Sequence, residues 1–323
     1  MNATQGMSPA DTLVLTRRVT LLSVATAAVL VAIKAVAWTA SGSTALLASL
    51  ADSGLDLIAS LVTFAAVRYA AVPPDAEHRF GHGKAEAFAS LVQAGLVFAS
   101  AALIAREAVG DFLNPHPLRQ EGWAIAVMVV STILTGLLIT AQTRVLRQTA
   151  SVAVSGDRAH YASDLASNLV ALAGIAASAW LGVNGLDAAA AVVIAALLLW
   201  GAVGVFREAS SQLMDRELPD DARARIVALM TEDLRLTDVH QLRTRASGPY
   251  VHIQMHVDLD PDLTLEAAHE VIVAAEKRLL AAFPQADILI HADPRGRAEP
   301  HGGAFAEHAV NETLRGGASV GRR

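Results

Sequence analysis

Two pairs of metal-ligand residues recur with the same spacing inside long apolar segments. Asp52 and Asp56 are four residues apart in one segment, and His160 and Asp164 are four apart in another. Residues at positions i and i+4 lie on the same face of a helix. Each helix can therefore present two ligands to the other, and a tetrahedral Zn²⁺ site requires four.

The membrane setting favours a functional interpretation of these pairs. A charged side chain at the centre of a span costs about 2.5–3.5 kcal/mol on insertion scales, and such residues usually mark an ion or proton pathway. A single Asp in a span could equally serve as a hydrogen bonder between helices. Two pairs with matched spacing are harder to explain by packing alone.

The proposed ligand set also predicts competition between metal and protons. Three carboxylates and one neutral imidazole carry a charge of −3, and a divalent ion leaves −1. Metal binding requires deprotonated ligands and releases protons. His160 is the natural proton carrier because the unperturbed pKa of histidine lies near physiological pH. Metal would exchange for protons if the site opened alternately to the two sides.

A second cluster follows Pro73 and Pro74, which end the preceding helical segment. Asp75, His78 and His82 lie in this loop and could hold a metal ion. The alternative is an ordinary solvated loop of mixed charge.

A third cluster lies near the C-terminus. His240, His256 and His291 fall on or near predicted strands, Asp293 follows two residues later, and His269 lies on a predicted helix. Their convergence does not follow from spacing. The alternative is a set of surface histidines without a ligand.

The apolar segments that must position these residues are long enough to cross a membrane, which takes about 20 residues in a helix. The sequence predicts an α-helical membrane domain with six spans, at Leu13–Thr39, Leu46–Ala70, Ala85–Gly110, Trp123–Gln142, His160–Leu181 and Leu186–Arg207. Lysine and arginine concentrate on one set of loops and flanks, which places both termini in the cytoplasm. The first segment is too long for a secretory signal and is read as a retained span.

After Arg207 the pattern changes to that of a small α+β domain. Residues 250–260 alternate between apolar and polar side chains, as a half-buried strand does. The predicted order is α-β-β-α-β, with helices over 218–234 and 265–283 and strands over 239–246, 250–260 and 287–291. The predicted domains are an N-terminal cytoplasmic segment (1–12), a transmembrane domain (13–207), a cytoplasmic metal-binding and dimerisation domain (208–294) and a disordered tail (295–323).

Composition narrows the chemistry. Hydrophobic residues make up 53% of the 323-residue chain and charged residues only 17%, below the roughly 25% usual in soluble domains. There is no cysteine, so any metal must be held by oxygen and imidazole nitrogen, which disfavours Cu(I). No basic patch suggests nucleic acid as a partner.

Five stretches of this sequence resemble the cation diffusion facilitator family, especially its bacterial zinc and ferrous-iron efflux branch. They are Ala51-Asp52-Ser53 with Asp56, the run from His78 to Glu86, His160-Tyr161 with Ser163-Asp164, Leu242 to Arg245 with Ser247-Gly248-Pro249, and Ile290-His291 with Asp293-Pro294. The resemblance runs from about Thr16 to Pro294.

The resemblance implies a homodimeric metal/proton antiporter of the inner membrane, with an α-β-β-α-β cytoplasmic domain of the metallochaperone-like type. It implies a transport site of Asp52, Asp56, His160 and Asp164, a loop site of Asp75, His78 and His82, and a two-metal cytoplasmic cluster of His240, His256, His269, His291 and Asp293. It also implies a charge pair between Lys84 and Asp215 that couples the two domains.

The resemblance bears on the metal as well. Histidine at position 160 matches the zinc and cadmium type of site, with iron and cobalt open, whereas the manganese branch usually has Asp there. One departure concerns Ala292, where the family branch often has a polar residue. Its methyl group cannot ligate, so the resemblance supports the transport site more fully than the cytoplasmic cluster.

Other function classes fit less well. A zinc protease would need His-Glu-x-x-His, but the run that begins His269-Glu270 has Val273 at the last position. No serine-hydrolase elbow is present either, so an enzyme is not expected. A membrane-tethered metal sensor or scaffold would have no use for carboxylates inside spans, and a passive channel would not depend on protons.

Overall fold

The computed structural model describes residues 8–42, 44–113, 122–181 and 186–297. It divides into two compact units, which meet in the sequence between Leu213 and Met214. The first seven residues of the predicted N-terminal segment and most of the predicted disordered tail, residues 298–323, lie outside the described part of the chain.

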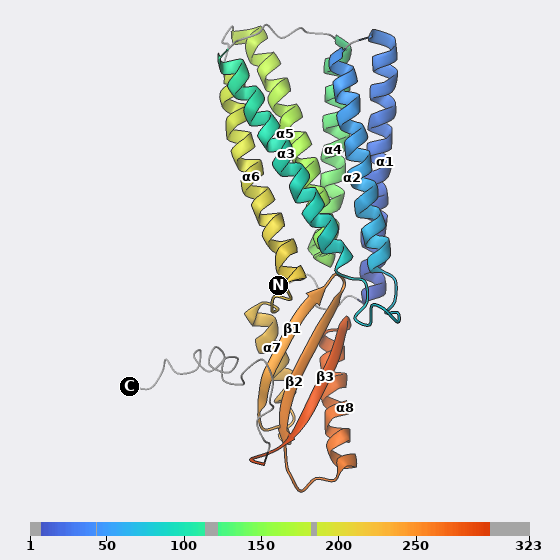
Figure 1. Cartoon of the computed structure of the whole chain (residues 1–323), viewed down its shortest axis with the longest axis vertical. Helices are drawn as coiled ribbons and strands as arrows, with labels where there is room; N and C mark the ends of the chain where they lie inside the picture. The colour runs from blue at the N-terminus through green and yellow to red at the C-terminus, as the bar shows by residue number, and fades with distance from the viewer. Residues whose placement is uncertain (1–7, 43, 114–121, 182–185, 298–323) are drawn as a thin grey trace, which may run out of the picture. The chain divides into compact units, whose positions relative to one another are not determined.

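The first unit is a bundle of long helices that run alongside one another (Figure 1). Their bounds are α1 Pro9–Ser41, α2 Thr44–Ala70, α3 Ala85–Leu113, α4 Gly122–Thr149, α5 Val152–Leu181 and α6 Leu186–Leu213. The shortest has 27 residues. At 1.5 Å per residue, a helix of that length exceeds the roughly 30 Å hydrocarbon core of a bilayer.

Within the described residues, five of these helices are long and apolar enough to cross a membrane: α1, α2, α3, α4 and α6. Helix α5 is not among these five, and its first half carries Asp157, Arg158 and Asp164. It also begins at Val152, eight residues before the predicted start at His160. A multi-pass helical membrane domain is therefore confirmed, while the sixth span stays a prediction.

Close approach of α3 and α5 depends on one glycine. A Cβ atom added to Gly156 would lie 2.8 Å from Ser90 Oγ and 3.0 Å from Ser90 Cα. Small residues let membrane helices pack closely and bring their polar side chains into contact. Next to this contact, the buried Asp157 carboxylate accepts hydrogen bonds from Gln93 on α3 and Gln142 on α4, at 3.2 and 2.8 Å.

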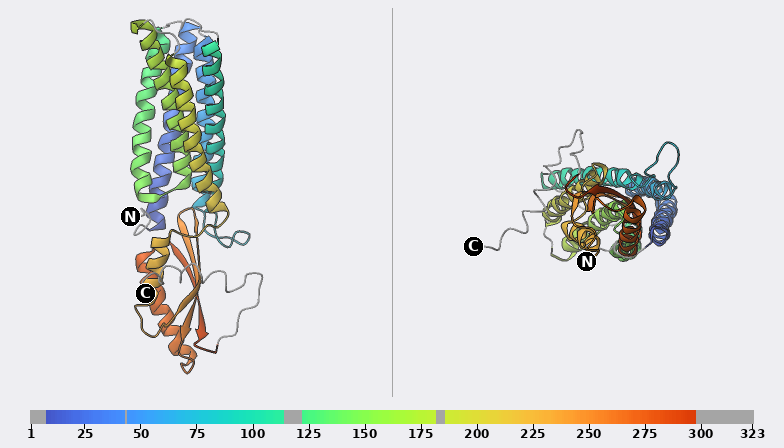
Figure 2. Two further views of the ribbon diagram at one scale, coloured as in Figure 1. Left: turned by 90° about the vertical axis from the view of Figure 1, so that its left-hand side faces the viewer. Right: turned by 90° about the horizontal axis from the view of Figure 1, so that it is seen from below.

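The second unit has the predicted order α-β-β-α-β. Its elements are α7 Asp220–Met230, β1 Val239–Ser247, β2 Tyr250–Leu259, α8 Leu265–Ala282 and β3 Ala286–Pro294 (Figure 2). The sheet order is β1-β2-β3, with β1 antiparallel and β3 parallel to the central β2. Parallel pairing of β2 and β3 requires a crossover, which α8 supplies.

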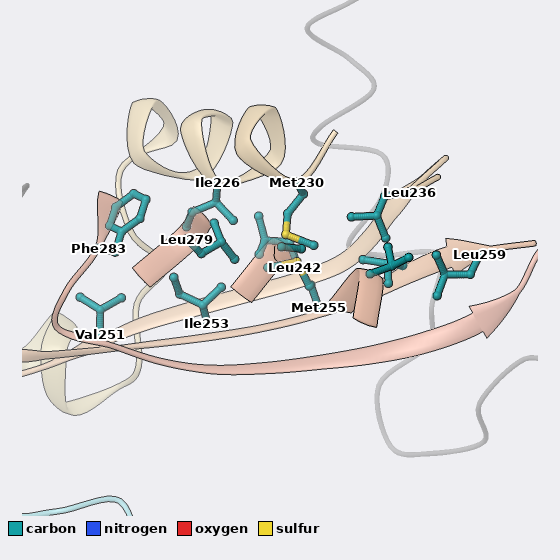
Figure 3. Close-up of a cluster of buried hydrophobic side chains, with 13 residues drawn as sticks. Ile226, Met230, Leu236, Leu242, Val251, Ile253, Met255, Leu259, Leu279 and Phe283 are labelled. Carbon is teal, nitrogen blue, oxygen red and sulfur yellow. The ribbon is translucent and has the colours of Figure 1, made fainter. Parts of the chain in front are cut away.

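Helices α7 and α8 cover one face of this sheet and close a hydrophobic core (Figure 3). Ile253 and Met255 of β2 project into it, together with Ile226 of α7 and Leu279 of α8, all 2% exposed or less. Side chains alternate along a strand, so His256 of β2 belongs to the opposite face. The core therefore fixes which face of the sheet carries the histidines.

Candidate metal centres

The first candidate centre lies within the helical unit and joins two helices. Asp56 on α2 and His160 and Asp164 on α5 bring their ligand atoms within 4.8 Å of one another. The His160 Nε2 atom lies 3.0 Å from Asp56 Oδ1 and 3.8 Å from Asp164 Oδ2. Ligands at about 2.0 Å from a tetrahedral Zn²⁺ are about 3.3 Å apart, so these separations suit a divalent ion.

Two polar atoms of this group lack a hydrogen-bond partner. Among the described residues, Asp164 Oδ2 and His160 Nδ1 are buried and accept or donate no hydrogen bond. Buried polar atoms are nearly always hydrogen-bonded, so each exception calls for a ligand, ion or water. The group therefore has donor atoms of the right type and spacing, with unused capacity to bind a cation.

Asp52, the fourth predicted ligand, is not part of this compact group. It lies one helical turn before Asp56 on α2, and its side chain is exposed. The structure therefore brings together three of the four predicted transport ligands.

Two buried charged residues beside this centre were not singled out from the sequence. Asp157 on α5 is fully buried, and Lys34 on α1 is 8% exposed. Both are charged residues inside long apolar segments of the sequence. Because a charge in a span is costly and usually functional, their position alone could have identified them.

The second centre lies in the loop between α2 and α3. Asp75, His78 and His82 bring their ligand atoms within 4.8 Å of one another. The Asp75 carboxylate lies 3.4 Å from His78 Nδ1 and 3.2 Å from His82 Nε2. The structure thus gathers all three predicted residues of the loop site.

His82 is held in an orientation suited to metal binding. It is 5% exposed, and its Nδ1 lies 3.2 Å from the carbonyl oxygen of Val72. When Nδ1 donates to that carbonyl, Nε2 keeps its lone pair and faces Asp75. A backbone carbonyl behind the second ring nitrogen is the usual support of a ligating histidine.

Asp75 is prepared for the same role. Its Oδ1 accepts hydrogen bonds from the backbone N–H groups of His78 and Glu77, at 2.6 and 2.9 Å. The pKa of the Asp75 carboxyl lies below its ordinary value. The main cause is the hydrogen bond from the His78 N–H group, and the bond from Glu77 and the nearby imidazoles add to it. Oδ2 remains directed at His82. The carboxyl is therefore kept ionised, as a metal ligand must be.

The third centre is a row of histidines across the sheet of the second unit. His240 on β1 is paired with His256 on β2, which is paired in turn with His291 on β3. All three approach the buried Asp293 carboxylate, at 3.2, 2.9 and 3.4 Å. The register of the strands, which the sequence did not reveal, is what brings them together.

Local structure and charge adapt this row to a cation. The register between β1 and β2 shifts after His240, and the adjacent Gln241 has a φ of 51°. Such bulges often re-aim side chains at functional sites. Burial opposes ionisation of Asp293, but the hydrogen bond from His256 and the neighbouring imidazoles outweigh it, so its pKa lies below the ordinary value.

His269 does not join this row. It is exposed on α8, which packs against the opposite face of the sheet. Within one chain the sheet separates His269 from Asp293, so it could contribute only across an interface with another copy. Ala292 packs against the hydrophobic core. Side chains alternate along β3, so residue 292 belongs to the core face and Asp293 to the face of the histidines. Alanine in place of a longer polar residue therefore leaves the His256–Asp293 contact intact.

The predicted charge pair joins residues of different units. In the first unit, Lys84 Nζ donates a hydrogen bond to the Leu213 carbonyl at 3.3 Å. In the second, the Asp215 carboxylate accepts from Arg245 at 3.2 Å. Their pairing stays a prediction.

Two family models match the chain and together cover most of it. Residues 20–214 match the cation efflux transmembrane domain, and residues 218–295 match the cytoplasmic domain of cation efflux proteins. Fold and site therefore define a membrane transporter of cations, and the chain belongs to the cation diffusion facilitator family.

Individual relatives agree with this assignment. The chain is 42% identical over 280 residues to the cation-efflux pump FieF of Serratia proteamaculans, covering 87% of this chain and 93% of that protein. It is 42% identical over 274 residues to FieF of Shewanella oneidensis, covering 84% and 92%. The chain is also similar to a solved structure of CzrB in its zinc form, at 33% identity over 26% of this chain and 98% of that one, with a TM-score of 0.25. The assignment rests on the two family models and the FieF relatives. The chain is thus a cation efflux transporter and not an enzyme.

Proposed function

We propose that this transporter carries a divalent transition metal, Zn²⁺ above all, out of the cytoplasm across the inner membrane in exchange for protons. The observation that carries the proposal is the Asp56–His160–Asp164 group, which lies between helices of the membrane unit with Asp56 and His160 buried. Carboxylates inside spans are expensive unless they line an ion pathway. Asp52, one turn away on α2, supplies the fourth ligand when the ion is bound.

The donor set supports zinc as the substrate. One imidazole and up to three carboxylates form a site of nitrogen and oxygen ligands without thiolate. Imidazole suits Zn²⁺, Fe²⁺ and Co²⁺ better than Mn²⁺, whose preferred ligands are oxygen. Fe²⁺, Cd²⁺ and Co²⁺ are therefore secondary substrates, and the selectivity rests mainly on His160.

Proton coupling follows from the same ligands. The ion binds to ionised carboxylates and a neutral imidazole, so a proton at any of them opposes metal binding. His160 Nε2 already faces both Asp56 and Asp164. When the site opens to the outside, protons that bind there would displace the metal, and their release inside would prepare the site for the next ion.

A homodimer with alternating access is the form in which we expect this to happen. The match to the cytoplasmic domain of cation efflux proteins supports this assembly, as does the place of His269 on the face away from Asp293. The charge pair of Lys84 with Asp215 would link the two domains. The distribution of arginine and lysine supports cytoplasmic termini.

The test is metal flux and internal pH measured together in reconstituted vesicles. The wild type should move Zn²⁺ with opposite proton movement, and Asp56→Asn should abolish both, since the site then loses an anionic ligand. Asp220→Asn, on an exposed side chain of the second unit, is the matched control and should transport as the wild type does. Zn²⁺ flux without proton movement would show a channel. Absence of flux with tight binding to the second unit would show a sensor.

A further inference from the structure

Lys34 is a buried cation that the ligand set does not explain. It lies within the candidate span of α1, Ala10–Ser41, and is 8% exposed. A buried lysine is expensive unless it is compensated. The presence of a lysine inside this span therefore indicates a structural or functional role for its side chain.

The hydrogen bonds of Lys34 direct its charge toward α2. Its Nζ donates to Ser53 Oγ at 2.6 Å and to the carbonyl oxygen of Ser49 at 3.1 Å. Ser53 lies between Asp52 and Asp56 in the sequence. Both acceptors are uncharged, so they orient the ammonium group without neutralising it.

Lys34 interacts electrostatically with the transport ligands. Burial disfavours the charged form of its amine, and the carboxylates of Asp52, Asp56 and Asp164 favour it. These are the three carboxylates of the proposed transport site, and they come from two helices other than that of Lys34.

Charge counting gives the lysine a definite role. Three carboxylates with a neutral His160 carry −3, and Lys34 reduces this to −2. One divalent ion then balances the charges of these four side chains, the three carboxylates and Lys34. A further buried carboxylate, Asp157, accepts hydrogen bonds from the neutral amides of Gln93 and Gln142, and its charge is additional to this count.

We propose that Lys34 is the resident counter-cation of the transport site, a positioning residue that sets metal affinity without being a ligand. In the metal-free site it reduces the repulsion among Asp52, Asp56 and Asp164. In the loaded site it repels the bound ion, which weakens binding and speeds release. The proposal rests on the proposed transport function, since it concerns the same site.

The test compares a neutral and a charged replacement in the full-length protein. Lys34→Gln keeps a side-chain N–H donor for Ser53 but removes the charge, whereas Lys34→Arg keeps both. At an effective dielectric constant of about 20, even unit charges about 10 Å apart change affinity by about tenfold. Lys34→Gln should therefore bind Zn²⁺ about tenfold more tightly, with lower KM and lower kcat, and Lys34→Arg should restore the wild-type values.

Two readouts make the result decisive. Zn²⁺ binding in detergent is measured by calorimetry, and the transport-site contribution is the difference from the same variant carrying Asp56→Ala. Vesicle flux then supplies KM and kcat. Lys34→Met, a second neutral replacement without a donor, should repeat the Lys34→Gln result if charge is the cause, and it replaces Lys34→Gln if that variant does not fold.

Equal or weaker Zn²⁺ binding in the neutral variants would overturn the proposal. So would Lys34→Arg behaving like Lys34→Gln, since that would show a role in packing only. The transport function is judged separately, by wild-type flux and its loss in Asp56→Asn. Flux with that loss but no Lys34 effect would refute this inference alone, and absence of flux in the wild type would refute the proposed function.

Discussion

His160 Nε2 lies 3.0 Å from Asp56 Oδ1, although 104 residues separate them in the sequence. This contact joins α5 to α2 at the proposed transport site. In the proposed site the imidazole is the one nitrogen donor among carboxylates, and we expect the choice of metal to depend on it.

Replacing that imidazole should change the metal preference. His160→Asp gives a site of oxygen ligands only, which suits Mn²⁺ better than Zn²⁺. We expect the ratio of kcat/KM for Zn²⁺ to that for Mn²⁺ to fall about tenfold or more, equivalent to about 1.4 kcal/mol. Competition between the two ions in vesicle flux measures this ratio. An unchanged ratio would mean that His160 does not contact the transported ion.

The two loop histidines should differ in their importance. His82 is buried and bonded to the Val72 carbonyl, whereas the His78 side chain is about half exposed. Removal of a supported ligand costs more than removal of a flexible one, so His82→Ala should weaken loop metal binding by at least about tenfold, and His78→Ala by less. Calorimetric Zn²⁺ titration of the full-length variants provides the comparison. The reverse order would contradict this account of the loop.

Asp293 should control metal binding in the second unit. Three histidines approach its carboxylate, whereas the Asp287 carboxylate on the same strand lies 3.0 Å from a different histidine, His252. Asp293→Asn should abolish Zn²⁺ binding at this cluster, and the matched Asp287→Asn should leave it intact. Zn²⁺ titration followed by histidine NMR signals would separate the two. Equal losses would show that the row across the sheet is not the binding site.

Gly156 should be required for the packing of α5 on α3. A methyl group there would meet the Ser90 backbone at 3.0 Å, and overpacking of this kind typically costs about 1–3 kcal/mol. Gly156→Ala should lower the thermal midpoint of the purified protein and reduce transport. Gly204→Ala on α6 is the matched control, because nothing lies within 4 Å of its added Cβ. Equal midpoints in the two variants would contradict close packing at Gly156.

Acid should weaken the turn that follows α7. Hydrogen bonds from Arg235 at 3.0 and 2.8 Å lower the pKa of Asp233 to about 2. A carboxyl whose pKa is lowered in the fold stabilises it above the unfolded pKa, near 3.9, and loses that effect as pH falls through about 2.

Hydrogen exchange measures this effect directly. At pH 5, Asp233→Asn should exchange the amides of residues 231–237 faster than the wild type, after correction for intrinsic rates. The difference should shrink as pH falls from about 4 to below about 2, because the wild-type carboxyl then becomes neutral as well. A difference that does not depend on pH would show that the charge of Asp233 is not responsible.

Local sequence patterns predicted many of the helices and strands of this protein. The alternation of residues 250–260 predicted β2 correctly, and the order α-β-β-α-β was confirmed. The i, i+4 spacing correctly put Asp52 with Asp56, and His160 with Asp164, on single helices. Such patterns are local because helix and strand periods are set by backbone geometry within a few residues.

Contacts between distant segments were decided by the tertiary structure. The register of β1 and β3 on β2 aligns His240, His256 and His291, and a bulge or slip of one residue would have separated them. Packing of α8 on the opposite face keeps His269 apart. The packing of α2 on α5 brings Asp56, His160 and Asp164 together, while Asp52 stays outside the group. Lys34 of α1 reaches α2 at Ser53, between Asp52 and Asp56. The sequence by itself determined which residues can bind a cation and on which elements they lie, because propensity and periodicity are local. Only the packing of those elements decided which of them meet, since that depends on side-chain volume and burial across the whole fold.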